Sequence, residues 1–196
     1  MNLANGLTLF RIILVPVFVA FLLTDGLPRH YLYALLVFAA ASVTDFLDGY
    51  VARKYDMITP LGKFLDPIAD KILTASALIC FVPFGWVEAW VVAVIISREF
   101  IVSGIRLAAV ESEEKIVIQA SFSGKLKTAF TMLAICFFLT CSAVTGGEFP
   151  PFAKTTGAVL MYICAALTVI SGIRYAWDYR HIFKPKSQNN GGYHGK

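Results

Sequence analysis

The chain has 196 residues, of which 58% are hydrophobic and 15% are charged. Soluble domains carry about a quarter charged residues, so this composition excludes an ordinary soluble enzyme or binding domain and indicates the membrane class. The net charge of +4 suits contact with anionic membrane lipids, and we expect no nucleic-acid partner.

Long apolar segments follow one another along the chain. A transmembrane helix needs about 20 mostly apolar residues. Six segments of this kind occupy approximately residues 7–24, 30–52, 63–83, 86–109, 124–146 and 152–178. We therefore predict an all-α, polytopic membrane protein with six transmembrane helices. One membrane domain is expected over residues 1–180, followed by a polar, disordered tail over residues 181–196.

Basic residues are distributed unevenly between the two sides of this predicted bundle. With the N-terminus in the cytoplasm, the opposite side holds only Arg29 and Lys154. The cytoplasmic side holds Arg53, Lys54, Lys63, Lys115, Lys125, Lys127, Arg180, Lys184, Lys186 and Lys196. Because cytoplasmic loops carry the excess of Lys and Arg, we predict a multi-pass protein of the cytoplasmic (inner) membrane. Both termini are expected on the cytoplasmic side.

Four aspartates interrupt the second and third apolar segments. Asp45 and Asp48 are three residues apart, and Asp66 and Asp70 are four apart, so each pair shares one helix face. A short turn joins the two helices, which lets the pairs face each other. Four converging carboxylates repel, so either some are protonated or cations lie among them. Two Mg²⁺ or Mn²⁺ ions would balance the charge; the alternative is four snorkelling or salt-bridged carboxylates at a membrane interface.

Small and basic residues accompany the first pair. Gly49 and Ala52 follow Asp48 on the same helix and leave space for close packing or for a bulky ligand. Arg53 can clamp a phosphate with its planar guanidinium group. The stretch is therefore suited to a phosphorylated ligand.

The spacing of these residues resembles the signature of the CDP-alcohol phosphatidyltransferase family. It is D-x-x-D-G-x-x-A-R from Asp45 to Arg53, then eight residues, then G-x-x-x-D-x-x-x-D from Gly62 to Asp70. The resemblance implies a six-helix membrane enzyme, generally a homodimer, that transfers a phosphatidyl or related group from a CDP-linked donor to an alcohol and releases CMP. It also implies that the four aspartates hold two metal ions, that Asp70 is the catalytic base, and that Gly49, Arg53 and Thr59 contact the CDP group.

The start of the chain, NLANGLTLFR, is similar to the N-x-L-T-x-x-R element of the same family. The resemblance implies that Asn5 and Thr8 lie near the nucleotide. Ala4 stands where many relatives have proline, which leaves both residues intact. A helix cap followed by an interfacial arginine, Arg11, is the structural alternative.

Basic residues in the later helices bear on the acceptor alcohol. Arg98 and Arg106 lie about two turns apart in the fourth segment, and Glu99 is expected to pair with a nearby cation. Lys125 and Lys127 open the fifth segment, where a positive-inside flank is the alternative. Several buried cations favour an acceptor that carries its own anionic group.

The patterns R-E-F-x-V-S-G-x-R and G-K-x-K-T resemble the branch of the family whose acceptor is sn-glycerol 3-phosphate. This implies transfer from CDP-diacylglycerol, with Arg98, Arg106, Lys125 and Lys127 around the acceptor phosphate. Thr131 departs from the branch, which often has glutamine there. Family members that use inositol phosphate, serine or phosphatidylglycerol remain alternatives. Outside the family, the alternatives are an aspartate-rich prenyltransferase, disfavoured by the single Asp motif, and a divalent-cation transporter.

Overall fold

The computed structural model describes residues 3–24, 26–55, 60–111 and 122–178. Within the helices only the backbone is described at 3–5, 7, 45–55, 60–68, 70, 106–111, 122–123, 125 and 178. The helices are α1 Leu3–Leu23, α2 His30–Tyr55, α3 Pro60–Phe81, α4 Ala89–Glu111, α5 Phe122–Thr145 and α6 Pro151–Asp178. Each predicted segment coincides with one helix, and the described part of the chain contains no strand. The all-α prediction is therefore confirmed. The predicted tail lies outside the described residues.

Local sequence explains where several helices begin and end. Pro60 and Pro151 occupy the first positions of α3 and α6, where the missing N–H is not needed and the fixed φ suits a helix. Gly85 follows α3 and Gly147 follows α5, with φ angles of 69° and 91°. Such angles favour glycine because a Cβ atom would be strained there.

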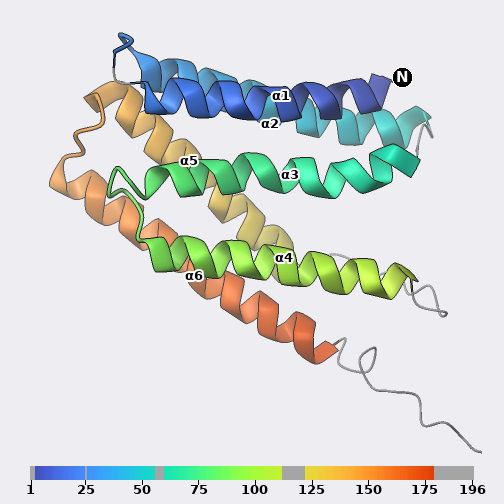
Figure 1. The fold of residues 1–196 in the computed structure, drawn as a ribbon. Coiled ribbons are helices and arrows are strands. Elements are labelled where there is room, and N and C mark those ends of the chain that lie inside the picture. Colours follow the sequence, from blue (N-terminus) through green and yellow to red (C-terminus); the bar gives the residue numbers. More distant parts are fainter. Residues whose placement is uncertain (1–2, 25, 56–59, 112–121, 179–196) are drawn as a thin grey trace, which may run out of the picture.

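The helices run alternately in opposite directions, so the bundle has two distinct halves (Figure 1). The ends of α1, α3 and α5 and the starts of α2, α4 and α6 lie at one end of the bundle, and we call this part the turn half. The other part, where α1 and α3 begin and α2 and α4 end, is the polar half. Helix α1 packs against α2 and α3, whereas α5 packs against α2 and α6. Helix α4 packs mainly against α6.

Apolar side chains are found on both the inner and the outer faces of the bundle. Phe18, Phe38 and Phe138 are buried in the core, whereas Val144 is 80% exposed. Conversely, the buried residues include Lys127 and other polar groups. Such an arrangement, with apolar groups outside and polar groups inside, is typical of helices that contact lipid.

Among the residues that the structure describes, two stretches are long and apolar enough to cross a membrane, namely Leu126–Thr145 and Pro151–Trp177. Shorter apolar stretches of 10–17 residues are Thr8–Leu23, His30–Thr44 and Lys71–Phe81. The prediction of six helices is thus confirmed, while the crossing of a membrane by all six stays a prediction.

Candidate functional site: an aspartate motif beside a buried ion network

The four aspartates lie on α2 and α3, which are consecutive and run in opposite directions (Figure 1). Asp45 and Asp48 are on α2, and Asp66 and Asp70 are on α3, with uninterrupted helix across both pairs. The predicted helical spacing is confirmed, so each pair shares one face of its helix. The side chains lie outside the described residues, and the predicted convergence of the two pairs stays a prediction.

The donor set of this motif is chemically suited to hard divalent cations. All four candidates supply carboxylate oxygens, which are the ligands that Mg²⁺ and Mn²⁺ prefer. Among the residues whose side chains are described, no group of three or more His, Cys, Asp or Glu is placed to hold a metal. Its carboxylate donor set makes the aspartate motif a candidate metal site.

The candidate donor-binding residues are distributed over α1, α2 and the connection that follows α2. The backbone places Asn5 in α1, and Gly49, Ala52 and Arg53 in α2 beyond Asp48. Thr59 lies outside the described residues.

Thr8 and Arg11 form a buried polar face of α1. The exposed fractions are 1% for Thr8 and 2% for Arg11. This burial disfavours the alternative of an arginine at the membrane interface. Since α1 packs against α2 and α3, the N-terminal element belongs to the polar half of the bundle together with the aspartate motif.

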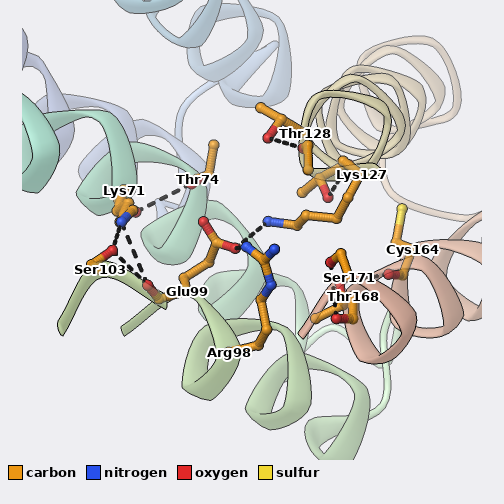
Figure 2. A network of polar contacts seen from close by, with 12 residues as sticks. Lys71, Thr74, Arg98, Glu99, Ser103, Lys127, Thr128, Cys164, Thr168 and Ser171 are labelled. Carbon is orange, nitrogen blue, oxygen red and sulfur yellow. Dashed lines mark hydrogen bonds and ion pairs between the residues drawn. The ribbon is translucent and has the colours of Figure 1, made fainter. Parts of the chain in front are cut away.

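A network of ion pairs joins α4 to α5 (Figure 2). Lys127 Nζ lies 2.7 Å from Glu99 Oε1, and Arg98 donates to the same oxygen at 2.9 Å. The Lys127 side chain is 5% exposed, Arg98 13% and Glu99 21%. The predicted pairing of Glu99 with a cation is therefore confirmed, and Arg98 and Lys127 meet at one carboxylate.

Lys71 adds a second branch, between α3 and α4 (Figure 2). Its Nζ donates to Ser103 Oγ and contacts the Glu99 carbonyl oxygen at 3.5 Å, and Ser103 Oγ donates to the same carbonyl oxygen at 2.7 Å. Lys71 follows Asp70 directly in the chain, so the aspartate helix is tied to the ion network. Sequence reasoning missed Lys71, although a lysine within an apolar run was the available signal.

Helix α6 also contacts the Arg98 side chain. The Arg98 guanidinium carbon lies 5.9 Å from the centre of the Tyr175 ring, a cation–π distance. A Cβ atom on Gly172 would approach Arg98 Cγ to 3.3 Å, so glycine there leaves room for the arginine stem. Arg98 Nε is buried and has no hydrogen-bond partner among the described residues. Arg98 thus retains a donor that an anion could use.

The other candidate acceptor residues continue this region along the same helices. Arg106 is on α4, two turns after Arg98, and Lys125 is on α5, two residues before Lys127. Their side chains lie outside the described residues. Arg174 of α6 is exposed, in agreement with a snorkelling role.

Two larger cavities lie beside the bundle in its described part. A groove of about 520 Å³ between α4 and α6 is mostly apolar and is lined by Arg98, Thr168 and Gly172, among others. A second cavity of about 650 Å³ lies in the turn half, between Trp86 and Tyr162. The groove between α4 and α6 borders the ion network through Arg98, and a small cavity of about 20 Å³ is lined by Lys71, Glu99 and Lys127 themselves. The turn-half cavity is lined by none of these residues, so it is not part of the candidate site.

Comparison with known proteins identifies the class to which this fold and site belong. The CDP-alcohol phosphatidyltransferase family model matches residues 1–170. The chain therefore belongs to the CDP-alcohol phosphatidyltransferase family.

The names of individual relatives are more specific than the name of the family. The chain is 38% identical over 189 residues to the CDP-diacylglycerol–glycerol-3-phosphate 3-phosphatidyltransferase of Bacillus subtilis, covering 91% of this chain and 93% of that protein. It is 38% identical over 178 residues to the protein of the same name from Haemophilus influenzae, covering 89% and 91% of the two chains. It is 40% identical over 178 residues to a probable phosphatidylglycerophosphate synthase of Mycobacterium tuberculosis, covering 89% and 79%.

Proposed function

We infer that this protein transfers the phosphatidyl group of CDP-diacylglycerol to sn-glycerol 3-phosphate. The products are phosphatidylglycerophosphate and CMP, and the reaction belongs to phospholipid biosynthesis. The relatives that share 38–40% identity over most of the chain are named for this reaction or for its product. The structural observation that carries the inference is the buried ion network, because Lys127 and Arg98 offer positive charge to a phosphorylated acceptor.

The aspartate motif is proposed to hold two Mg²⁺ or Mn²⁺ ions, with Asp45, Asp48, Asp66 and Asp70 as ligands. Bound ions of this kind neutralise the charge of a diphosphate and improve CMP as a leaving group. The carboxylate donor set supports this proposal.

The chain's own residues are proposed to bind and orient the two substrates. Asp70 accepts the proton of the acceptor's primary hydroxyl, which requires that hydroxyl to be held close to the carboxylate. The CDP group of the donor is bound by Asn5, Thr8, Gly49, Ala52, Arg53 and Thr59. The acceptor phosphate is bound by Arg98, Arg106, Lys125 and Lys127. Burial of Thr8 and the meeting of Arg98 and Lys127 at Glu99 support these assignments.

The proposed setting is the inner (cytoplasmic) membrane. All six helices are proposed to cross it, with both termini and the active site on the cytoplasmic side, as the excess of basic residues there favours. The apolar outer faces of the helices support lipid contact. A homodimer is proposed from the family membership alone.

The function is tested by CMP release from CDP-diacylglycerol with purified protein in detergent. We expect release with sn-glycerol 3-phosphate in the presence of Mg²⁺ or Mn²⁺, and none after chelation with EDTA. A panel of serine, inositol phosphate and phosphatidylglycerol serves as the control for the acceptor. Preference for one of these three would replace the acceptor assignment, while retained activity in EDTA would remove the metal proposal. A melting temperature that rises with metal alone, and not further with CDP-diacylglycerol, would favour a transporter.

A further inference from the structure

Glu99 occupies a distinctive place in the ion network. A single oxygen, Oε1, accepts from Lys127 Nζ on α5 and from Arg98 on its own helix α4. Its backbone carbonyl oxygen accepts from Ser103 Oγ and contacts Lys71 Nζ of α3. One residue therefore connects the basic groups of three helices.

The described part of this network contains more basic than acidic side chains. Lys71, Arg98 and Lys127 are basic, and Glu99 is the acidic side chain that the structure describes among them. The described part of the network thus carries an excess of positive charge, which suits a phosphate monoester with a charge of about −1.5 to −2 at neutral pH. One carboxylate offsets the cost of burying Lys127 without cancelling the whole charge.

The bonds to Glu99 leave capacity for a further anion. Lys127 has three N–H donors, and one of them is directed at Glu99. Arg98 uses one terminal nitrogen for Glu99, and its buried Nε has no partner among the described residues. A lysine stem is flexible, so a fixed carboxylate reduces the freedom that Lys127 would lose on binding an anion.

We propose that Glu99 is a positioning residue that holds Lys127 and Arg98 in place for the acceptor phosphate. This proposal rests on the proposed function. It assigns Glu99 a role in acceptor affinity, exerted through Lys127 and Arg98, and no contact with the reacting atoms.

The first test is a kinetic comparison of Glu99→Gln with the unmodified enzyme. A hydrogen bond to a charged group contributes enough that its loss corresponds to about 10- to 100-fold. We expect the KM for sn-glycerol 3-phosphate to rise by about that factor, with kcat and the KM for CDP-diacylglycerol nearly unchanged. An unchanged KM for the acceptor would overturn the proposal. A lower KM for the acceptor would also overturn it, because it would mean that the carboxylate competes with the phosphate. An equal rise in the KM for both substrates would overturn it as well, because it would indicate a structural role.

A double-mutant cycle tests whether Glu99 acts through Lys127. When Lys127→Gln is already present, adding Glu99→Gln should raise the KM for the acceptor by a smaller factor than it does in the unmodified enzyme, because only the effect through Arg98 is left. Fully additive effects would contradict the proposal. Glu88→Gln is the matched control, because Glu88 precedes the same helix in the turn half and bonds Tyr162; its kinetics should equal those of the unmodified enzyme.

A binding measurement keeps the test independent of activity and of folding problems. Inorganic phosphate should raise the melting temperature of the unmodified protein and of Glu88→Gln, but not that of Glu99→Gln. Equal protection of all three proteins would overturn the role of Glu99.

If Glu99→Gln does not fold, the KM of Glu99→Asp for the acceptor is measured instead. We expect a KM between those of the unmodified enzyme and Lys127→Gln, and a value equal to that of the unmodified enzyme would contradict the proposal. If the unmodified protein formed no product from these substrates, the proposed function would fail, and phosphate protection would still decide the role of Glu99.

Discussion

The two halves of the bundle are built on different physical principles. In the turn half, Phe81, Trp86, Phe138 and Phe149 pack with ring centroids 4.9–6.2 Å apart, and Gly147 allows a turn close to Tyr31. The polar half holds the aspartate motif and the Lys127–Glu99–Arg98 network.

This difference indicates which half of the bundle contributes mainly to stability and which contributes mainly to chemistry. Aromatic burial stabilises a fold without directing it toward a ligand, whereas buried charged groups are costly and are retained where they serve a site. Substitutions in the turn half should therefore change stability, and substitutions in the polar half should change catalysis or substrate affinity.

The largest effect is expected for Asp70→Asn. Loss of a general base lowers the rate by about 10²- to 10⁴-fold, and weaker metal binding would add to it, so turnover should fall by about 10³-fold or more. Donor binding should be largely retained, as measured by protection of the protein by CDP-diacylglycerol against heat. A variant with near-normal turnover would contradict the assignment of Asp70 as the base.

Phe138→Ala tests the turn half. Phe138 is 1% exposed and contacts four aromatic neighbours, and a Phe→Ala change in a core costs about 3–5 kcal/mol. We expect a lower melting temperature but an unchanged KM for both substrates at a temperature where the variant is folded. A selective change in the KM for the acceptor would remove the distinction between the halves.

Arg106→Ala combined with Lys125→Ala tests the acceptor assignments that the described side chains do not cover. Loss of charged hydrogen-bond donors should raise the KM for sn-glycerol 3-phosphate by about 10-fold or more, with little effect on the melting temperature. An unchanged KM would assign both residues to the positive-inside flank. Lys154→Ala, which removes one positive charge in the turn half, is the control and should leave the KM for the acceptor unchanged.

The smallest effect is expected for Gly172→Ala. The added Cβ atom would lie 3.3 Å from Arg98 Cγ, so the arginine stem must shift by a few tenths of an ångström. We expect an increase of about two- to threefold in the KM for the acceptor, in the range of a weakened contact. Gly104→Ala is the control, because nothing lies within 4 Å of the added atom. It should leave the KM for the acceptor unchanged.

The sequence was sufficient for the local features of this protein. Long apolar runs bounded by Gly and Pro predicted each helix, because helix formation depends on composition and on nearby breakers. The spacing of the four aspartates predicted two pairs on helix faces, and the basic residues around Glu99 led us to expect that it pairs with a nearby cation, which the structure confirms. Family membership also followed from the eight fixed positions of the motif between Asp45 and Asp70.

Only the tertiary structure decided which helices share their polar groups. Glu99 and Lys127 are 28 residues apart, and Lys71 and Ser103 are 32 apart. Helices that are apolar on all sides carry no periodic pattern to indicate which face meets which neighbour. The partners of Glu99 and Lys71 therefore depend on how α3, α4, α5 and α6 pack, and that packing is what gathers the basic side chains in one half of the bundle.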